Sequence, residues 1–300
     1  EVTEAELSAI GEGMVLITDN DNAQVVLDHI RSGCVVYFTE GTYTDLEAPG
    51  DVVNPEVGYL RIRPSRYNGA VIHKGVWASG IGWYKGDIME SVDDSNVGDL
   101  SAINFYDLSL EDICFIGDDN AVFEVGFGIS TGHIYQQTEN DGTVIKSPYD
   151  AVKQVYLQSQ TANSYYATIC IDGIEFHNMH FKGDGNNLDF MYYQDDSYLR
   201  NVLIDSCSFI TDGVTSNLAA IRMNADNTGM YKDICVSDSD FRNVYQGVYV
   251  QGAENMVVEN SRFDTTVHNA IAVQSGGSNQ FSGEIRITGN TFANIGDRII

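Results

Sequence analysis

The second half of the chain repeats one pattern of apolar and polar positions. The pattern is eight residues long and begins with two apolar residues separated by one residue of any type. A small or polar residue follows near the end, and a phenylalanine closes the pattern two positions later. The alternation at its start is typical of a β-strand with one buried face. Copies lie at Ile174–Phe181, Val202–Phe209, Ile234–Phe241, Met256–Phe263 and Ile285–Phe292, with an earlier copy at Leu108–Phe115.

A second short apolar strand follows each of these phenylalanines from Phe181 onward. The phenylalanines are 28, 32, 22 and 29 residues apart, and repeats of this length indicate a solenoid or a propeller. A propeller blade needs four strands, whereas here the strand pattern is constant and only the spacing varies. We therefore predict stacked coils joined by loops of different lengths. The second strands are Leu188–Phe190, Ile221–Met223, Val248–Val250, Ile271–Val273 and Ile299–Ile300.

This arrangement predicts an all-β fold: a single-stranded right-handed parallel β-helix that forms one domain over residues 1–300. Equivalent strands stacked at ~4.8 Å bring each phenylalanine over the next, as an internal aromatic ladder. The position two before each phenylalanine forms a second column at a corner, where small polar side chains can hydrogen-bond along the stack. That column consists of Cys207, Ser239, Ser261 and Asn290.

The two ends of the stack need covers, because an open coil exposes strand edges and phenylalanine rings. Asp21 and Asn22 can cap a short amphipathic helix that Gly33 stops, so residues 21–33 are predicted to plug the first coil. Residues 124–167 lack the pattern and are predicted to form a large loop excursion. The sequence stops at Ile300 inside a second strand. We expect the natural protein to continue, or a further domain or other element to cover this end.

The charge narrows the range of partners. The formal net charge is −27, from 43 acidic and 16 basic residues, so nucleic acid is excluded as a natural partner. Anionic polysaccharides would be repelled unless Ca²⁺ bridged the contact, whereas a neutral glycan is not repelled. The apolar runs are too short to span a membrane. The five scattered cysteines and the histidines, including the pair His177 and His180, show no zinc-site spacing and are expected to be structural or surface residues.

Outward positions on the second strands carry the candidate binding groups. If Leu188, Ile221 and Val248 point inward, their neighbours Asp189, Arg222 and Tyr249 form one outward column. A further outward column then holds Met191, Asn224, Gln251 and Gln274. An acid, a guanidinium, a tyrosine and several amides on one face resemble a sugar-binding site, although ordinary solvated surface is the alternative interpretation.

Cleavage of a glycosidic bond requires two carboxyl groups, one as acid and one as nucleophile or base. Asp189 with Asp196 is the first choice, because the loop after the strand could fold its carboxylates back over Asp189. That loop also contains Tyr192 and Asp195 as candidate binding residues. The second choice is Asp226 with Asp233.

The remaining candidates are two tryptophans that could bind sugar rings and one possible Ca²⁺ site. Trp77 and Trp83 lie among glycines and could stack on sugar rings, or could instead pack under a loop. No cofactor is predicted, but Asp195 and Asp196 could bind Ca²⁺. A Ca²⁺-dependent polysaccharide lyase is therefore the second hypothesis. It is weaker because Lys and Arg do not cluster on the predicted face.

The repeated pattern and the N-terminal plug resemble the pectate-lyase-like β-helix superfamily over nearly the whole chain, a likeness that implies fold more than function. Within it, the acidic composition and the stretch Asn294–Ile300 look like glycoside hydrolase family 136, the bacterial lacto-N-biosidases. That resemblance implies a retaining mechanism on type-1 milk or mucin glycans, with two aspartates seven residues apart. Both Asp189–Asp196 and Asp226–Asp233 have this spacing. The resemblance also implies that a folding partner could cover the C-terminal end, since some members need one.

The sequence thus favours a secreted or cell-surface bacterial glycoside hydrolase for neutral oligosaccharides. A non-catalytic glycan-binding β-helix, such as an adhesin or a phage spike module, is the alternative from another class.

Overall fold

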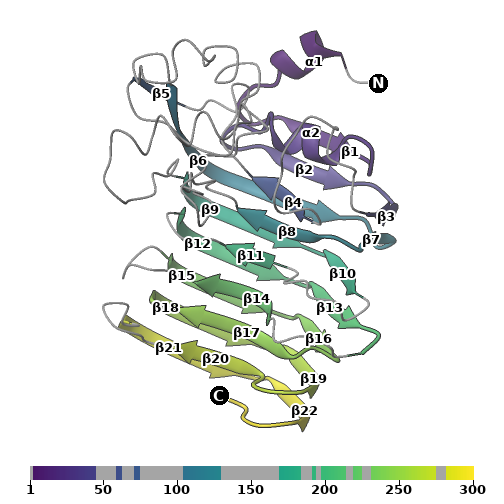
Figure 1. Cartoon of the computed structure of the whole chain (residues 1–300), viewed down its shortest axis with the longest axis vertical. Helices are drawn as coiled ribbons and strands as arrows, with labels where there is room; N and C mark the ends of the chain where they lie inside the picture. The colour runs from purple at the N-terminus through teal and green to yellow at the C-terminus, as the bar shows by residue number, and fades with distance from the viewer. Residues whose placement is uncertain are drawn as a thin grey trace, which may run out of the picture.

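The structure is a computed structural model that describes residues 3–44, 59–62, 71–74, 104–129, 169–183, 191–193, 197–213, 219–224, 231–274 and 282–300. These residues form 22 β-strands and two short helices. The strands make three sheets, which we name A, B and C, and every strand pair but one is parallel (Figure 1). The described part of the chain is therefore mostly β, as the sequence predicts.

Sheet A is the largest of the three sheets. Strand β5 (Val71–Lys74) is its exception, since it runs antiparallel to β6. In spatial order the parallel strands are β1 (Val15–Thr18), β2 (Val35–Phe38), β6 (Asn104–Gly117), β9 (Ile169–His177), β12 (Ser197–Asp205), β15 (Tyr231–Ser237), β18 (Ala253–Glu259) and β21 (Ser282–Thr288).

Sheets B and C are made of shorter strands. Sheet B contains β3 (Gly41–Tyr43), β7 (Ala121–Phe123), β10 (His180–Gly183), β13 (Ser208–Thr211), β16 (Asp240–Arg242), β19 (Arg262–Thr266) and β22 (Thr291–Ile295). Sheet C contains β4 (Tyr59–Ile62), β8 (Gly126–Ile129), β11 (Met191–Tyr193), β14 (Ala219–Asn224), β17 (Gln246–Gln251) and β20 (Ile271–Gln274).

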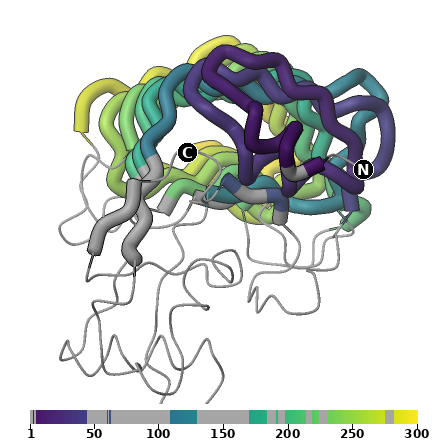
Figure 2. The backbone as a smooth tube through the Cα atoms, turned by 90° about the horizontal axis from the view of Figure 1, so that it is seen from above, coloured from purple at the N-terminus to yellow at the C-terminus, as the bar shows by residue number. Residues whose placement is uncertain are grey.

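The chain visits the three sheets in a fixed order. From β2 onward it passes from sheet A to sheet B to sheet C and back to sheet A, and only β5 interrupts this order. We call one such passage a unit. Within each sheet, a strand pairs in parallel with the equivalent strand of the next unit. Seen from above, successive units overlie one another (Figure 2).

The aromatic ladder is confirmed for five of the six predicted phenylalanines. Their rings stack along sheet B in register, with centroids 4.6–5.3 Å apart. The prediction for Phe115 is wrong: it lies in sheet A and pairs with Phe176. The reason is that Leu108–Phe115 falls on the continuous strand β6, without a bend before the phenylalanine. Phe123 and Tyr43 extend the ladder instead.

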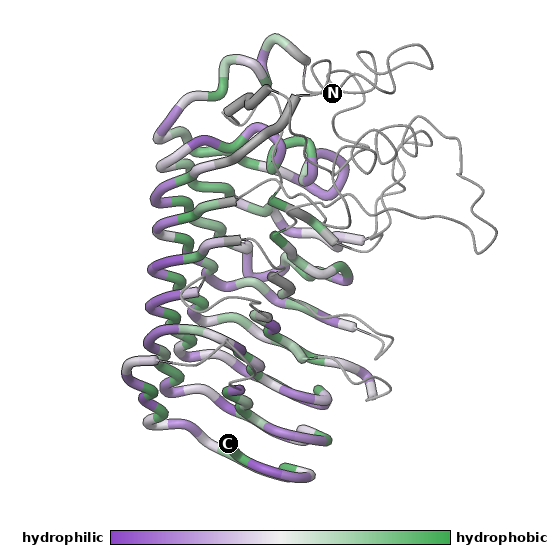
Figure 3. The backbone as a smooth tube through the Cα atoms, turned by 60° about the vertical axis from the view of Figure 1, so that its left-hand side comes forward, coloured by the Kyte–Doolittle hydropathy of each residue, from purple (hydrophilic) through white to green (hydrophobic). Residues whose placement is uncertain are grey.

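Inward-facing apolar side chains fill the space between the sheets. In sheet C, five residues in register have no exposed surface, and aliphatic positions of sheet A are equally buried. Figure 3 shows apolar and polar segments recurring at the same places in successive units. Stacking therefore buries one continuous core. The sheet C column is Phe127, Met191, Ile221, Val248 and Ile271.

From β9 onward, the corner between sheets A and B is two residues long in every unit. For example, β12 ends at Asp205 and β13 begins at Ser208. The first corner residue adopts a positive φ, which Asn, Asp and Gly tolerate best. In the five units from β9 onward these residues are Asn178, Ser206, Asp238, Asn260 and Gly289.

The second corner residue forms the predicted polar column. The backbone N–H of Cys207 donates to Oγ of Ser239 over 3.2 Å, and the N–H of Ser239 donates to Oγ of Ser261 over 3.1 Å. The N–H of Ser261 in turn donates to Oδ1 of Asn290 over 2.8 Å. These bonds satisfy buried donors at the corner, so the prediction of hydrogen bonds along the stack is confirmed.

The helix predicted at residues 21–33 is present but shorter. Helix α2 spans Ala23–Leu27, follows strand β1 and adds its buried apolar side chains to the core. The Asn22 side chain makes no capping hydrogen bond, which helps to explain the short helix. Helix α1 (Glu4–Ser8) and β1 were not predicted. No described helix is long and apolar enough to cross a membrane.

Two further boundaries differ from the predictions. Strand β8 occupies 126–129, within the stretch 124–167 for which a loop excursion was predicted, and residues 130–168 lie outside the described residues. At the C-terminal end, the N–H of Ile271 donates to the carbonyl of Ile299 over 3.0 Å. Ile299 therefore lies beside β20, as predicted, and both Ile299 and Ile300 are exposed.

Candidate functional site

The outer face of sheet C carries two columns of polar and aromatic residues. The register pairs Tyr192 with Arg222 and Arg222 with Tyr249. Two positions further along the strands, Asn224 pairs with Gln251, which pairs with Gln274. For Arg222, Tyr249, Asn224 and Gln251 this agrees with the columns predicted from the sequence.

The predicted register of the preceding strand is wrong by three residues. Met191, not Leu188, aligns with Ile221, so the position that pairs with Arg222 belongs to Tyr192 and not to Asp189. Met191 is also fully buried rather than outward-facing. The run from Leu188 to Tyr193 is apolar or aromatic at all but one position, so alternation alone cannot select the inward residue.

Tyr249 is the centre of a polar cluster on this face. Its hydroxyl lies 3.1 Å from Oε1 of Gln251 and 3.0 Å from Oε1 of Gln274, so the single proton can be donated to either amide. The Arg222 guanidinium carbon lies 5.8 Å from the Tyr249 ring centroid, within the range of a cation–π contact. We call Arg222, Tyr249, Gln251 and Gln274 the sheet C cluster.

The sheet C cluster offers groups that recognise hydroxyls. A guanidinium donates hydrogen bonds in a fixed plane, and each glutamine amide both donates and accepts. Arg222, Tyr249 and Gln251 are half-buried, which limits their motion, and Gln274 is exposed. Ala272, next to Tyr249 in the column, is small and buried. The described residues of the two columns contain no carboxyl group, so this cluster does not itself contain the carboxyl pair of a glycoside hydrolase.

Six of the predicted site residues lie outside the described residues. They are Trp77, Trp83, Asp189, Asp195, Asp196 and Asp226. Tyr192 and Asn224 are described by their backbone positions in β11 and β14.

Asp233, from the second-choice catalytic pair, lies in sheet A rather than on the sheet C face. It adopts a positive φ of 54°, and Nδ2 of Asn255 donates to its Oδ1 over 2.8 Å. Residues at the same place in other units, among them Asp112 and Asn201, also have positive φ. Asp233 thus belongs to a column of left-handed backbone positions that runs across sheet A.

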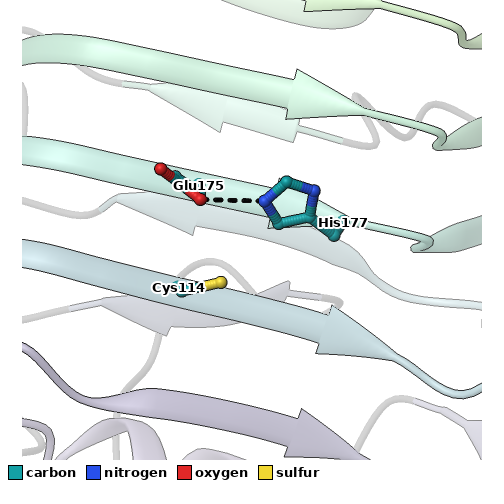
Figure 4. Close-up of side chains that lie close together, drawn as sticks. All are labelled: Cys114, Glu175 and His177. Atoms are coloured by element: carbon teal, nitrogen blue, oxygen red, sulfur yellow. Dashed lines mark hydrogen bonds and ion pairs between the residues drawn. The ribbon is translucent and has the colours of Figure 1, made fainter.

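A second group of reactive side chains lies on the outer face of sheet A (Figure 4). Cys114 on β6 is the register partner of Glu175 on β9, and His177 follows two residues later on β9. One ligand atom from each of these three residues lies within 4.8 Å of the other two. Nε2 of His177 and Oε2 of Glu175 are hydrogen-bonded at 2.9 Å. We call these residues the sheet A triad.

Asp205 on the next strand adjoins the sheet A triad. Its Oδ2 lies 3.5 Å from Nδ1 of His177, and its Oδ1 accepts a hydrogen bond from Ser237 over 2.6 Å. Burial by itself raises the pKa of Asp205, but hydrogen bonds from Ser237, Ser206 and His177 outweigh burial, and the pKa falls below its ordinary value. Burial, with a contribution from Glu175, raises the pKa of Cys114 to about 11, so its thiol is protonated at neutral pH.

The sheet A triad was not expected from the sequence, which suggested structural or surface roles for its cysteine and histidine. His177 and His180 do lie on different sheets, and Nδ1 of His180 is hydrogen-bonded to Oγ of Ser208 at 2.9 Å. The missed signal was the spacing Glu-x-His on a predicted strand, which places both side chains on one face. Cys114 could be added only from the register between β6 and β9.

The chain matches no protein-family model, no curated protein and no solved structure.

Proposed function

We propose that this chain is a right-handed parallel β-helix that binds a neutral oligosaccharide on the outer face of sheet C and hydrolyses it. The regular passage through sheets A, B and C supports the β-helix interpretation, because each unit from β6 to β20 supplies one strand to every sheet. The finer assignment to the pectate-lyase-like superfamily rests on the sequence pattern. A secreted or cell-surface location follows from a glycan substrate.

The observation that carries this proposal is the sheet C cluster. Four side chains from three successive units present donors, acceptors and an aromatic ring on one face. Rigid strands hold them at fixed spacing, which suits repeated hydroxyl groups along a sugar chain. The net charge of −27 favours an uncharged ligand over a polyanion.

Hydrolysis is assigned to Asp189 and Asp196. Asp233 is held by Asn255 in sheet A, so the Asp226–Asp233 pair is the weaker choice. One of the two carboxyl groups would protonate the leaving oxygen, and the other would attack the anomeric carbon. The likeness to lacto-N-biosidases suggests lacto-N-tetraose as the first substrate to test. On this proposal Trp77, Trp83, Tyr192 and Asp195 contribute to substrate binding.

Binding and catalysis can be tested separately on the full chain. Binding of neutral oligosaccharides is measured by calorimetry on wild type, Tyr249→Ala and Gln251→Ala. Each truncation should weaken binding about 3- to 10-fold, since one hydrogen bond is worth about 0.5–1.5 kcal/mol. Tyr198→Ala is the matched control, because Tyr198 is an exposed tyrosine on sheet A. If Tyr249→Ala binds as tightly as wild type, sheet C is not the binding face.

Catalysis is measured with lacto-N-tetraose and aryl β-glycosides on Asp189→Asn and Asp196→Asn. Loss of activity in both variants, with binding retained, is the expected result. Full activity in either variant removes that pair. Glycan binding without hydrolysis in wild type would favour a non-catalytic adhesin or spike module. A Ca²⁺-dependent rise in ultraviolet absorbance on pectate would indicate a lyase.

A further inference from the structure

The sheet A triad has the composition and placement of a metal site. Parallel pairing brings Cys114 on β6 next to Glu175 on β9, and the two-residue spacing puts His177 on the same face. Strands within a sheet are fixed by their hydrogen bonds, so the three side chains converge without a loop rearrangement. Figure 4 shows all three on one face of the sheet.

We propose that Cys114, Glu175 and His177 bind one Zn²⁺ ion, with Asp205 holding the His177 ring in place. A thiolate, an imidazole and a carboxylate together are ligands typical of zinc, whereas Ca²⁺ and Mg²⁺ prefer oxygen ligands alone. Three protein ligands leave the fourth tetrahedral position open. Because the Glu175 side chain is 51% exposed, water can reach that position.

The distances require only small side-chain movements. Zinc bonds of 2.0–2.3 Å imply ligand atoms separated by roughly 3.3–3.8 Å around a tetrahedron. The present separation of 2.9 Å between His177 Nε2 and Glu175 Oε2 would open by a few tenths of an ångström. The widest separation, within 4.8 Å, would close by about 1 Å. Rotation of the Glu175 carboxylate can open its separation from His177, because this side chain is half-exposed.

Asp205 provides an independent argument. A histidine that binds zinc through one ring nitrogen usually donates its other N–H to a carboxylate, which fixes the ring and its tautomer. Here Nε2 of His177 faces the other two ligands, and Nδ1 lies 3.5 Å from Asp205. Asp205 is itself positioned by Ser237 at 2.6 Å and Ser206 at 3.1 Å. Asp205 is thus positioned to orient the His177 ring, as the second carboxylate of a zinc site does.

This site is separate from the proposed glycan site, since it lies on sheet A and the glycan site lies on sheet C. Zinc bound there would link β6 to β9 across the unit boundary. A cation also reduces the repulsion between the carboxylates of Glu175 and Asp205 in a strongly acidic chain.

The test uses Co²⁺ as a spectroscopic probe of the full chain under reducing conditions. Wild type should bind one Co²⁺ with the visible bands of a tetrahedral site and a near-ultraviolet thiolate-to-cobalt band, and Zn²⁺ should displace it. Cys114→Ser should lose the thiolate band, and His177→Ala should bind at least 10-fold more weakly. Asp205→Asn should keep the thiolate band but bind about 10- to 100-fold more weakly.

Cys235→Ser is the matched control, because Cys235 lies in the same outward column two units beyond Glu175 and has Glu259 nearby. This variant should keep the cobalt spectrum of wild type. Far-ultraviolet circular dichroism establishes that each variant is folded. The proposal is overturned if folded wild type gives no tetrahedral cobalt spectrum. It is equally overturned if Cys114→Ser keeps the thiolate band, or if Cys235→Ser loses it.

Discussion

The aromatic ladder can be tested at Phe241, which lies in its interior. Phe241 is fully buried, and its ring stacks on Phe209 at 4.9 Å and on Phe263 at 4.6 Å. Phe241→Ala removes the ring and leaves a cavity that neighbouring units cannot fill. Such truncations cost about 3–5 kcal/mol, so we expect a loss of about 4 kcal/mol in the free energy of unfolding.

Two further variants, Phe292→Ala and Phe241→Leu, separate the contribution of the cavity from the contribution of ring stacking. Phe292 is only partly buried and has one ring neighbour, Phe263 at 5.3 Å, so Phe292→Ala should cost about half as much. Phe241→Leu keeps most of the volume but loses two ring pairs worth about 0.5–1.5 kcal/mol each. Its expected cost is therefore about 1–3 kcal/mol.

Urea unfolding followed by circular dichroism measures these differences as shifts of the midpoint at a common slope. Equal costs for Phe241→Ala and Phe292→Ala would contradict the argument, because the two sites differ in burial and in ring neighbours. A cost for Phe241→Leu as large as that for Phe241→Ala would show that ring stacking, and not the cavity, determines the loss.

Three further predictions concern the corners and the acid range. Ser239→Ala removes the acceptor of a buried backbone N–H in the preceding unit and should cost about 1–3 kcal/mol in urea unfolding. Asn260 has φ 52°, so Asn260→Ala should lower stability by about 1–2 kcal/mol, whereas Asn260→Gly should cost less. Hydrogen bonds from the Asn120 N–H and from the Tyr37 hydroxyl lower the pKa of Asp118 below 3.8. The ionised Asp118 carboxylate therefore stabilises the fold above its pKa in the unfolded chain, and this stabilisation is lost as the pH falls through its pKa in the folded chain. Asp118→Asn should thus flatten the dependence of the free energy of unfolding on pH in that acidic range, as measured by urea unfolding at several pH values.

The strand pattern predicts the fold where the local alternation of apolar residues and the recurrence of the phenylalanines point to the same units. From Ile174 onward, each unit contains an alternating strand, a two-residue corner and a phenylalanine, so one alignment of the sequence gives the register of sheets A and B. The same pattern fails at Phe115, where a strand continues without a bend. The positive-φ column of sheet A was also readable, because Asn, Asp or Gly precedes the first apolar residue of most copies.

The candidate sites were predictable only in part. Arg222 and Tyr249 align because the strands around them alternate cleanly between buried and outward positions. The strand before them offers two apolar registers, and only packing selects Met191 over Leu188. The sheet A triad joins Cys114 to Glu175, which are far apart in the chain. Because the segments between strands vary in length, the spacing of two such residues in the sequence does not show that they are register partners.

The unequal corners determine where a chain of this kind can gain new segments. The turn between sheets A and B is two residues in every unit from β9 onward, since its polar column fails if the turn is lengthened. By contrast, three residues join β16 to β17, and seven join β13 to β14. Insertions are therefore tolerated beside sheet C and not beside the A–B turn. Grafted peptides, or natural sequence divergence, would therefore change the loops that join sheet B to sheet C, while the A–B turn would remain constant.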